Sequence, residues 1–258
     1  MKASRLLTLV LLAVPLAVAC AVVPAAAATR SRSTPRVASR PAQGVDDSVD
    51  PKPVFLADCA ICHGSDARGT NNGPDLRGLG RASIDYELST GRMPLSSPTA
   101  KTERRPPKYP PALQEALVTY VYDLAGGGGV DIPELQLEHA DLAAGGELFR
   151  LNCAACHAWS SRGGALLERE APSTHPATPL QIAEAIRVGP GTMPAFGTAA
   201  ITDKQLNDIV AYVRYLRHPR DRGGNPLWYL GPLVEGGVAW IIGLGLLLVV
   251  IRLIGTPR

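Results

Sequence analysis

One five-residue pattern, present twice, most constrains how this chain can fold. Cys59-Ala60-Ile61-Cys62-His63 recurs as Cys153-Ala154-Ala155-Cys156-His157, and a phenylalanine stands four residues before each first cysteine. A Gly-x-Met-Pro sequence and then an apolar run with helical spacing follow each copy, the runs being 113–124 and 204–216. Repeated features in one order indicate repeated structural units. The sequence therefore predicts two homologous domains.

The Cys-x-x-Cys-His pattern is the attachment signature of c-type haem. Two thiols about one helical turn apart face the same side, where each can form a thioether with a haem vinyl group. The histidine that follows is placed to ligate the iron. We therefore predict two covalent haem c groups, attached through Cys59 and Cys62 and through Cys153 and Cys156, with His63 and His157 as iron ligands.

Two other kinds of site use paired cysteines. A four-cysteine zinc site would have to join pairs that lie about 90 residues apart, and it would not require a histidine after each pair. A thioredoxin-like redox pair would need a βαβ pattern around the motif, which is missing here. Both alternatives are weaker than haem attachment.

Methionine is scarce in this chain. After Met1 only Met93 and Met193 occur, both before proline, 30 and 36 residues beyond the motif histidines. Their equivalent positions predict that they are the second axial ligands, which would fill both irons and suit electron transfer. The other histidines, His139, His175 and His218, fall at no repeated position, although His175 could in principle replace Met193.

The two ends of the chain are basic and apolar, whereas its middle is acidic. Residues 45–235 hold 18 basic and all 23 acidic residues, so the overall charge of +3 comes from the ends and argues for no nucleic-acid partner. Residues 1–28 are typical of a signal sequence or an N-terminal membrane segment. Residues 230–254 form a second apolar run that predicts a transmembrane helix. Arg252 and Arg258 favour a cytoplasmic C-terminus, with the rest of the protein outside the cytoplasm.

These features together resemble the di-haem cytochrome c subunit of the actinobacterial cytochrome bc complex. The resemblance rests on the paired motifs, on Ser89-Thr90-Gly91-Arg92-Met93-Pro94, on Gly145-Gly146-Glu147-Leu148-Phe149, and on Trp240-Ile241-Ile242-Gly243 in the closing helix. It implies an electron-transfer subunit of a quinol–cytochrome c reductase in the cell membrane. Cytochrome b and a Rieske iron–sulfur protein would be its partners, and a terminal cytochrome c oxidase would accept its electrons.

The resemblance also implies that the carbonyls of Pro74 and Pro172 orient His63 and His157. Two departures stand out. The second unit lacks the leucine expected two residues after Pro172, and the first opens at residues 50–55 without the glycine and longer helix of the family. Pro53 predicts a short helix there, and leaves open whether it packs against Tyr120.

The expected fold class is all-α, with two tandem class I cytochrome c domains followed by a C-terminal transmembrane helix. We place a disordered tether at 29–49, the domains at 50–129 and 143–222, and a linker at 130–142. Residues 97–111, rich in proline and basic residues, are an insertion that the second domain lacks, either a solvated loop or a docking surface.

Two other functions remain open. A subunit of another membrane oxidoreductase, such as an oxidase, would usually carry its anchor before the haem domains. A di-haem peroxidase needs an open or displaceable iron ligand, against which both Met93 and Met193 argue.

Overall fold

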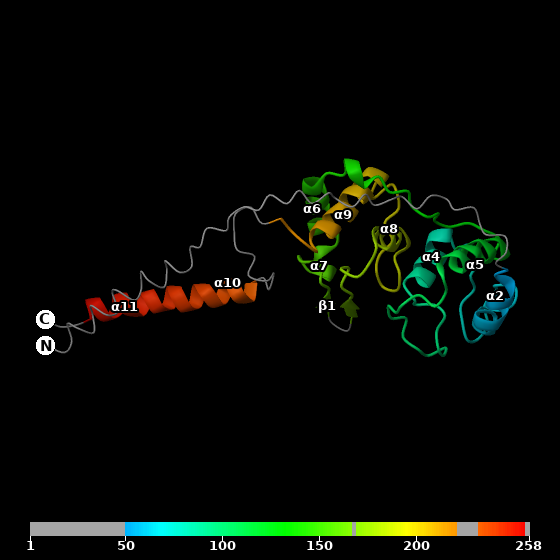
Figure 1. Cartoon of the computed structure of the whole chain (residues 1–258), viewed down its shortest axis with the longest axis horizontal. Coiled ribbons are helices and arrows are strands. Elements are labelled where there is room, and N and C mark those ends of the chain that lie inside the picture. Colours follow the sequence, from blue (N-terminus) through cyan, green and yellow to red (C-terminus); the bar gives the residue numbers. More distant parts are fainter. Residues whose placement is uncertain (1–49, 167–168, 221–231, 256–258) are drawn as a thin grey trace. The chain divides into compact units, whose positions relative to one another are not determined.

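The computed structural model describes residues 50–166, 169–220 and 232–255. The predicted signal segment 1–28 and tether 29–49 lie outside these residues. Helices make up most of the regular structure (Figure 1). We call α2 to α5 the first helical group and α6 to α9 the second helical group, because each surrounds its own cluster of buried apolar side chains.

The first helical group contains one copy of the motif and the helices that enclose it. It consists of α2 (Lys52–Asp58), α3 (Ala60–His63), α4 (Arg81–Ser89) and α5 (Pro111–Leu124). Phe55 and Leu117 are almost fully buried at its centre. The predicted helix at 113–124 is thus confirmed as α5, and Pro53 lies in the first turn of a helix of only seven residues, as expected.

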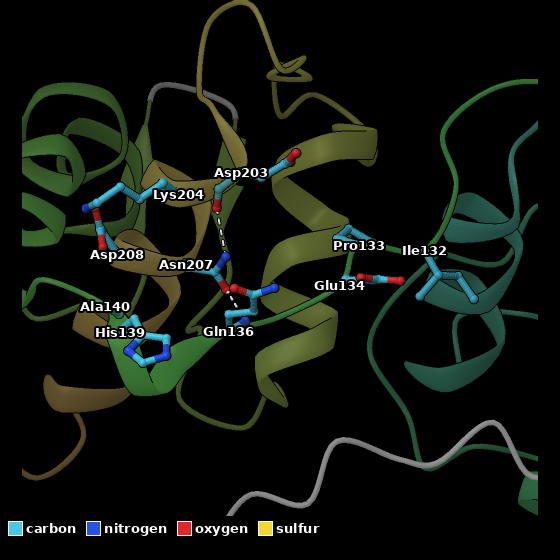
Figure 2. Close-up of a pocket in the computed structure, with 10 residues that line it drawn as sticks. All are labelled: Ile132, Pro133, Glu134, Gln136, His139, Ala140, Asp203, Lys204, Asn207 and Asp208. Atoms are coloured by element: carbon cyan, nitrogen blue, oxygen red, sulfur yellow. Dashed lines mark hydrogen bonds and ion pairs between the residues drawn. The ribbon is translucent and has the colours of Figure 1, made fainter.

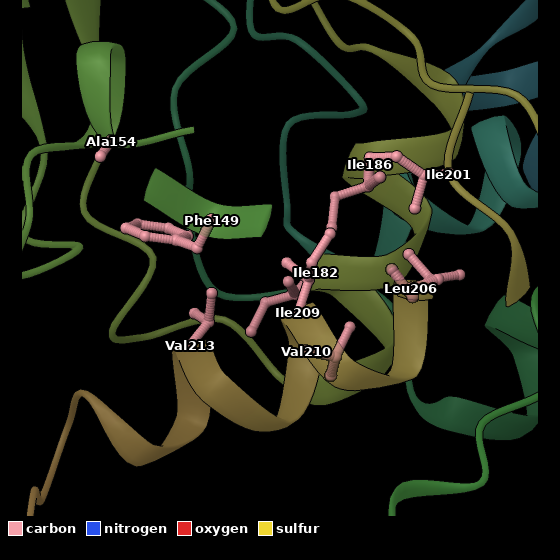
Figure 3. Close-up of a cluster of buried hydrophobic side chains, with 10 residues drawn as sticks. Phe149, Ala154, Ile182, Ile186, Ile201, Leu206, Ile209, Val210 and Val213 are labelled. Carbon is pink, nitrogen blue, oxygen red and sulfur yellow. The ribbon is translucent and has the colours of Figure 1, made fainter. Parts of the chain in front are cut away.

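The second helical group repeats this order. After the 3₁₀ turn η1 (Leu137–His139) come α6 (Leu142–Asn152), α7 (Ala154–His157), α8 (Pro179–Val188) and α9 (Asp203–Tyr215). Figure 3 shows apolar side chains of α6, α8 and α9 converging on one core, which includes Phe149, Ile182 and Ile209. Thr178 and Thr202 begin α8 and α9 with capping boxes, which bond the free backbone N–H groups of the first turn.

Equivalent aromatic pairs join the first and last helices of each group. The Phe55 and Tyr120 ring centroids are 5.5 Å apart, and those of Phe149 and Tyr212 are 5.7 Å apart. The short α2 therefore does pack against Tyr120. α6 has 11 residues, four more than α2, and Gly145 allows it to approach α9 closely, because an added Cβ there would lie 2.0 Å from the Asp208 carbonyl oxygen.

A small hairpin departs from the predicted all-α class. β1 (Gly164–Leu166) pairs antiparallel with β2 (Arg169–Ala171), and Gly164 lies opposite Ala171. Each strand has three residues, too few to show an alternating apolar pattern in the sequence. The hairpin lies directly before Pro172 and lengthens the loop that follows the second motif.

The C-terminal helical segment consists of α10 (Pro232–Val238), the π-helical stretch η3 (Ala239–Leu244) and α11 (Gly245–Ile254). Residues 236–254 have a mean hydropathy of 2.5, and none of this stretch is buried inside the protein. About 20 apolar residues suffice to cross a bilayer. The segment is therefore long and apolar enough to be the membrane anchor predicted at 230–254.

Candidate haem-binding sites

Each motif occupies a single helical turn. His63 N–H donates to the Cys59 carbonyl (2.9 Å), and His157 N–H donates to the Cys153 carbonyl (2.9 Å). This turn places the two cysteines and the histidine of each copy side by side, as two thioether bonds and an iron ligand require. Within the described residues, the cysteines are Cys59, Cys62, Cys153 and Cys156, and none of them forms a disulfide.

Both motif histidines are held by a proline carbonyl. His63 Nδ1 lies 2.8 Å from the Pro74 oxygen, and His157 Nδ1 lies 3.0 Å from the Pro172 oxygen. A carbonyl oxygen only accepts, so each Nδ1 carries the proton and Nε2 keeps its lone pair. A second partner of this kind orients a metal-ligating imidazole and fixes its tautomer. Both rings are therefore prepared to bind iron through Nε2.

The loops after the two motifs share one backbone path but differ in side chains. In the first loop, Leu76 N–H donates to the Ala67 carbonyl (2.9 Å), and in the second, Thr174 N–H donates to the Ser161 carbonyl (3.0 Å). Ala67 and Ser161 are both fully buried with positive φ. The Ser161 and Thr174 hydroxyls bond to each other. A polar pair thus replaces the leucine missing after Pro172, and it preserves the position of that proline.

Met93 and Met193 lie at equivalent places. Met93 packs on the buried cluster of the first helical group, as does Cys59, and Met193 packs on that of the second, as does Cys153. Each methionine follows the third helix of its group, α4 or α8. The fold therefore brings each methionine to the same core as the motif that the sequence pairs with it.

The surroundings of the motifs fit a large planar group with acidic edges. Gly73 lies against the second cysteine of the first motif, where an added Cβ would be 2.8 Å from Cys62 Cβ. Arg92, directly before Met93, has a buried Nη1 atom that finds no hydrogen-bond partner among the described residues. A haem propionate would supply that partner.

Burial raises the pKa of Cys59 and of Cys153 to about 11, so both thiols are neutral at pH 7.

The remaining histidines are not placed to bind haem iron. His175 Nε2 lies 2.9 Å from the Ser160 carbonyl oxygen, so this ring is tied to its own loop. His139 and His218 are exposed. In the described part of the chain, no three His, Cys, Asp or Glu side chains come together as a metal site, and the two cysteine pairs lie in different helical groups.

An open groove of about 580 Å³ lies between the segment 132–140 and the start of α9 (Figure 2). Several of its polar groups bond to each other: Asn207 Oδ1 accepts from Gln136 N–H (2.8 Å), and Lys204 Nζ donates to Asp208 Oδ2 (2.8 Å). None of the motif residues lines it. The groove is therefore a surface feature beside the candidate haem sites.

Comparison with known proteins identifies the family. The chain is 38% identical over 201 residues to the cytochrome bc1 complex cytochrome c subunit of Mycobacterium bovis, with 75% of this chain and 72% of the relative aligned. It belongs to the family of cytochrome bc1 complex cytochrome c subunits. The subunit of Corynebacterium diphtheriae is 33% identical over 222 residues, covering 80% of this chain and 79% of its own length.

Two other matches are shorter. Residues 140–213 match the family described as cytochrome c oxidase, cbb3-type, subunit III. Cytochrome c6 of Leptolyngbya boryana is 36% identical over 78 residues, which is 29% of this chain and 91% of that protein. As a member of the cytochrome bc1 complex cytochrome c subunits, the protein carries a cytochrome c domain with covalently bound haem c and takes part in electron transport.

Proposed function

We propose that this chain is a membrane-anchored di-haem electron carrier in which both helical groups are cytochrome c domains. The observation that carries the proposal is the equivalence of the two sites: in each, a proline carbonyl holds the Nδ1 of a motif histidine, and a methionine packs on the same core as the first cysteine. Haem c, when bound, supplies an iron that cycles between ferric and ferrous.

The side chains have distinct roles in this proposal. Cys59 and Cys62 would hold one haem covalently, and Cys153 and Cys156 would hold the other. His63 and Met93 would bind the iron at the first site, and His157 and Met193 would bind the iron at the second. An iron bound by both of these side chains would have no place for substrate, which suits one-electron transfer.

The family supports a proposal for the path of the electrons. The relatives are named as subunits of the cytochrome bc1 complex, which makes cytochrome b and the Rieske iron–sulfur protein the expected partners of this chain. The protein would take electrons from the Rieske protein and pass them through its two sites to a terminal cytochrome c oxidase. Arg252 and Arg258 at the end of the anchor favour a cytoplasmic C-terminus, which puts both helical groups on the outer face of the membrane.

Cysteine substitutions test the number of haems and their attachment. Replacing Cys59 and Cys62 together by serine should reduce covalent haem from two per chain to one, measured as the pyridine haemochrome of denatured protein. Replacing Cys153 and Cys156 should do the same. Cys20→Ser is the matched control, since this cysteine lies outside both motifs, and it should keep two haems. Two haems in either double variant would refute the assignment.

Methionine substitutions test the ligands. Met93→Ala and Met193→Ala should each open one iron, which would then bind carbon monoxide in the ferrous state, whereas the parent protein should not. An unchanged spectrum would remove that methionine from the site.

Purification from membranes in mild detergent tests the partners. Cytochrome b, the Rieske protein and oxidase subunits should co-purify with the haem-stained chain. Haem without these partners would contradict the proposed path.

A further inference from the structure

The third helices of the two groups, α4 and α8, contact each other. Gln181 Nε2 on α8 donates to the Ser89 carbonyl on α4 (2.9 Å). Arg104, from the segment between α4 and α5, donates to Gln181 Oε1 (2.7 Å) and to the Pro176 carbonyl (3.1 Å). The contact between the two helical groups is therefore specific and polar.

Two carboxyl groups meet inside this contact. Glu184, one turn after Gln181 on α8, has no exposed surface, and Asp85 on α4 is only 8% exposed. Asp85 Oδ1 accepts a hydrogen bond from Gln114 Nε2 (2.9 Å). Within the described residues, no hydrogen-bond donor reaches either carboxyl oxygen of Glu184. A buried carboxylate with no donor or cation is strongly disfavoured, so Glu184 needs a proton to stay buried.

The surrounding charges do not neutralise the pair. The other titratable and charged groups on the elements packed around it include Arg81, Tyr86 and Glu87 on α4, Arg92 and Arg104 between α4 and α5, Glu115 and Asp123 on α5, Arg187 on α8, and Asp203, Lys204 and Asp208 on α9. Burial also raises the pKa of Glu87, one of whose carboxyl oxygens finds no hydrogen-bond partner among the described residues. Arg104 is bonded to Gln181, Arg187 Nη2 is bonded to Asp203 (2.6 Å), and Arg92 lies over the Tyr86 ring. Burial, reinforced by the negative charge of Asp85, raises the pKa of Glu184 to about 10.

We propose that Glu184 and Asp85 share one proton across the contact of α4 and α8, and that this proton is required for the two helical groups to stay together. Glu184 and Asp85 are then positioning residues that set the distance between the two Cys-x-x-Cys-His motifs. The inference concerns the arrangement of the groups and does not rest on the electron path proposed above.

The sign of the pH dependence follows from proton binding. When the groups separate, water solvates Glu184 and its pKa returns towards the ordinary value of 4.5. Between that value and about 10, the docked form therefore holds one more proton than the separated form. The docking equilibrium should weaken as pH rises, by up to about tenfold per pH unit.

A distance measurement on the full chain tests this inference. Gadolinium spin labels are placed on Ala112→Cys and Ala143→Cys, exposed positions on α5 and α6, in a Cys20→Ser background. Pulsed electron–electron double resonance is recorded on the reduced protein, in which ferrous low-spin haem is diamagnetic. The same pair is also measured with Gln181→Ala, which removes the bonds to Ser89 and Arg104. This change weakens the docking of the two helical groups, so that the separated form becomes populated enough to measure.

We expect a single short distance at about pH 6 and a growing population of longer distances towards about pH 11. Glu184→Gln should keep the short distance at both pH values, because its neutral amide needs no proton and can donate to Asp85. Glu147→Gln, the same change at an exposed position of α6, should behave like the parent protein. A distance independent of pH in both backgrounds would overturn the proposal, as would a pH dependence that survives in Glu184→Gln.

Infrared spectroscopy gives an independent measurement that needs no spin label. A protonated carboxyl group has a carbonyl stretch that a carboxylate lacks. This band should be present at neutral pH in the parent protein and in Glu147→Gln, and it should be weaker in Glu184→Gln, where Glu87, whose pKa burial also raises, is the other buried carboxyl group. An equally strong band in the parent protein and in Glu184→Gln would refute the shared proton even if the groups remain docked.

Discussion

The residue after each motif histidine provides a test, because glycine should be more stable than alanine at both equivalent positions. Gly64 has φ +78° and ψ 154°, and Ala158 has φ 60° and ψ 163°. This region of backbone conformation is almost restricted to glycine and costs other residues on the order of 1–3 kcal/mol. The first site has the residue that suits this turn, whereas the second has an alanine under strain.

The magnitudes follow from two opposing terms. Glycine at position 158 would relieve about 1–3 kcal/mol of strain and would lose about 0.5–1 kcal/mol through the greater freedom of the unfolded chain. Ala158→Gly should thus raise the free energy of unfolding by about 1 kcal/mol. Gly64→Ala should lower it by about 1–2 kcal/mol, since the new Cβ would also lie 3.0 Å from Asp66 Oδ1.

Guanidinium unfolding of the haem-loaded protein, followed by far-UV circular dichroism, measures both changes. Ala143→Gly is the matched control, because it makes the same exchange at an exposed helical position, where it should lower the free energy of unfolding by up to about 1 kcal/mol. If Ala158→Gly destabilises the protein as much as this control does, the turn is not strained and the reasoning fails.

Three further predictions concern stability. Gly145→Ala should lower the free energy of unfolding by about 1–3 kcal/mol, because its Cβ would force α6 away from α9, and chemical denaturation would show a gain instead if helix propensity dominated. Thr202→Ala removes the capping oxygen from Gln205 N–H and should cost about 1 kcal/mol, whereas Thr202→Ser should restore most of it. Hydrogen bonds from Lys108 and Tyr109 lower the pKa of Asp58 below its ordinary 3.8, so their stabilisation is present above that value and lost as pH falls through the folded pKa. Asp58→Asn should flatten the acid limb of a pH titration of thermal stability, and an unchanged limb would contradict this.

Local sequence patterns predicted the features that depend on local chemistry. The two motif turns, the helices at 113–124 and 204–216, and the short helix at Pro53 all follow from spacing and backbone restrictions within a few residues. The prolines at 74 and 172 could be pointed to only by family resemblance, because the hydrogen bonds to His63 and His157 join residues 11 and 15 positions apart.

Contacts between distant segments were beyond such patterns. The helical period of α8 shows which residues share a face, but it does not show that the face with Glu184 meets α4. An acidic residue three positions before Arg187 suits a solvated ion pair equally well. In the structure Arg187 turns to Asp203 instead, and Glu184 is left to Asp85. The partner of Glu184 therefore depends on which helix packs against this face of α8, and the sequence of α8 does not show which helix that is.

The insertion at 97–111 is a difference between the two helical groups that bears on function, because only the first group has it. At one end of its basic segment, Arg104 reaches Gln181 and Pro176 of the second helical group. At the other, Lys108 and Tyr109 both donate to Asp58, the residue directly before Cys59, the first cysteine of the first motif. One segment thus joins the first motif to the contact of α4 and α8, and the second helical group has no equivalent of it in the sequence. Neither the solvated-loop nor the docking-surface interpretation included this intramolecular role.

Shortening the segment while keeping Arg104 would separate its two functions. Docking of the two helical groups should persist, while the bonds to Asp58 and the stability they confer at neutral pH should be lost.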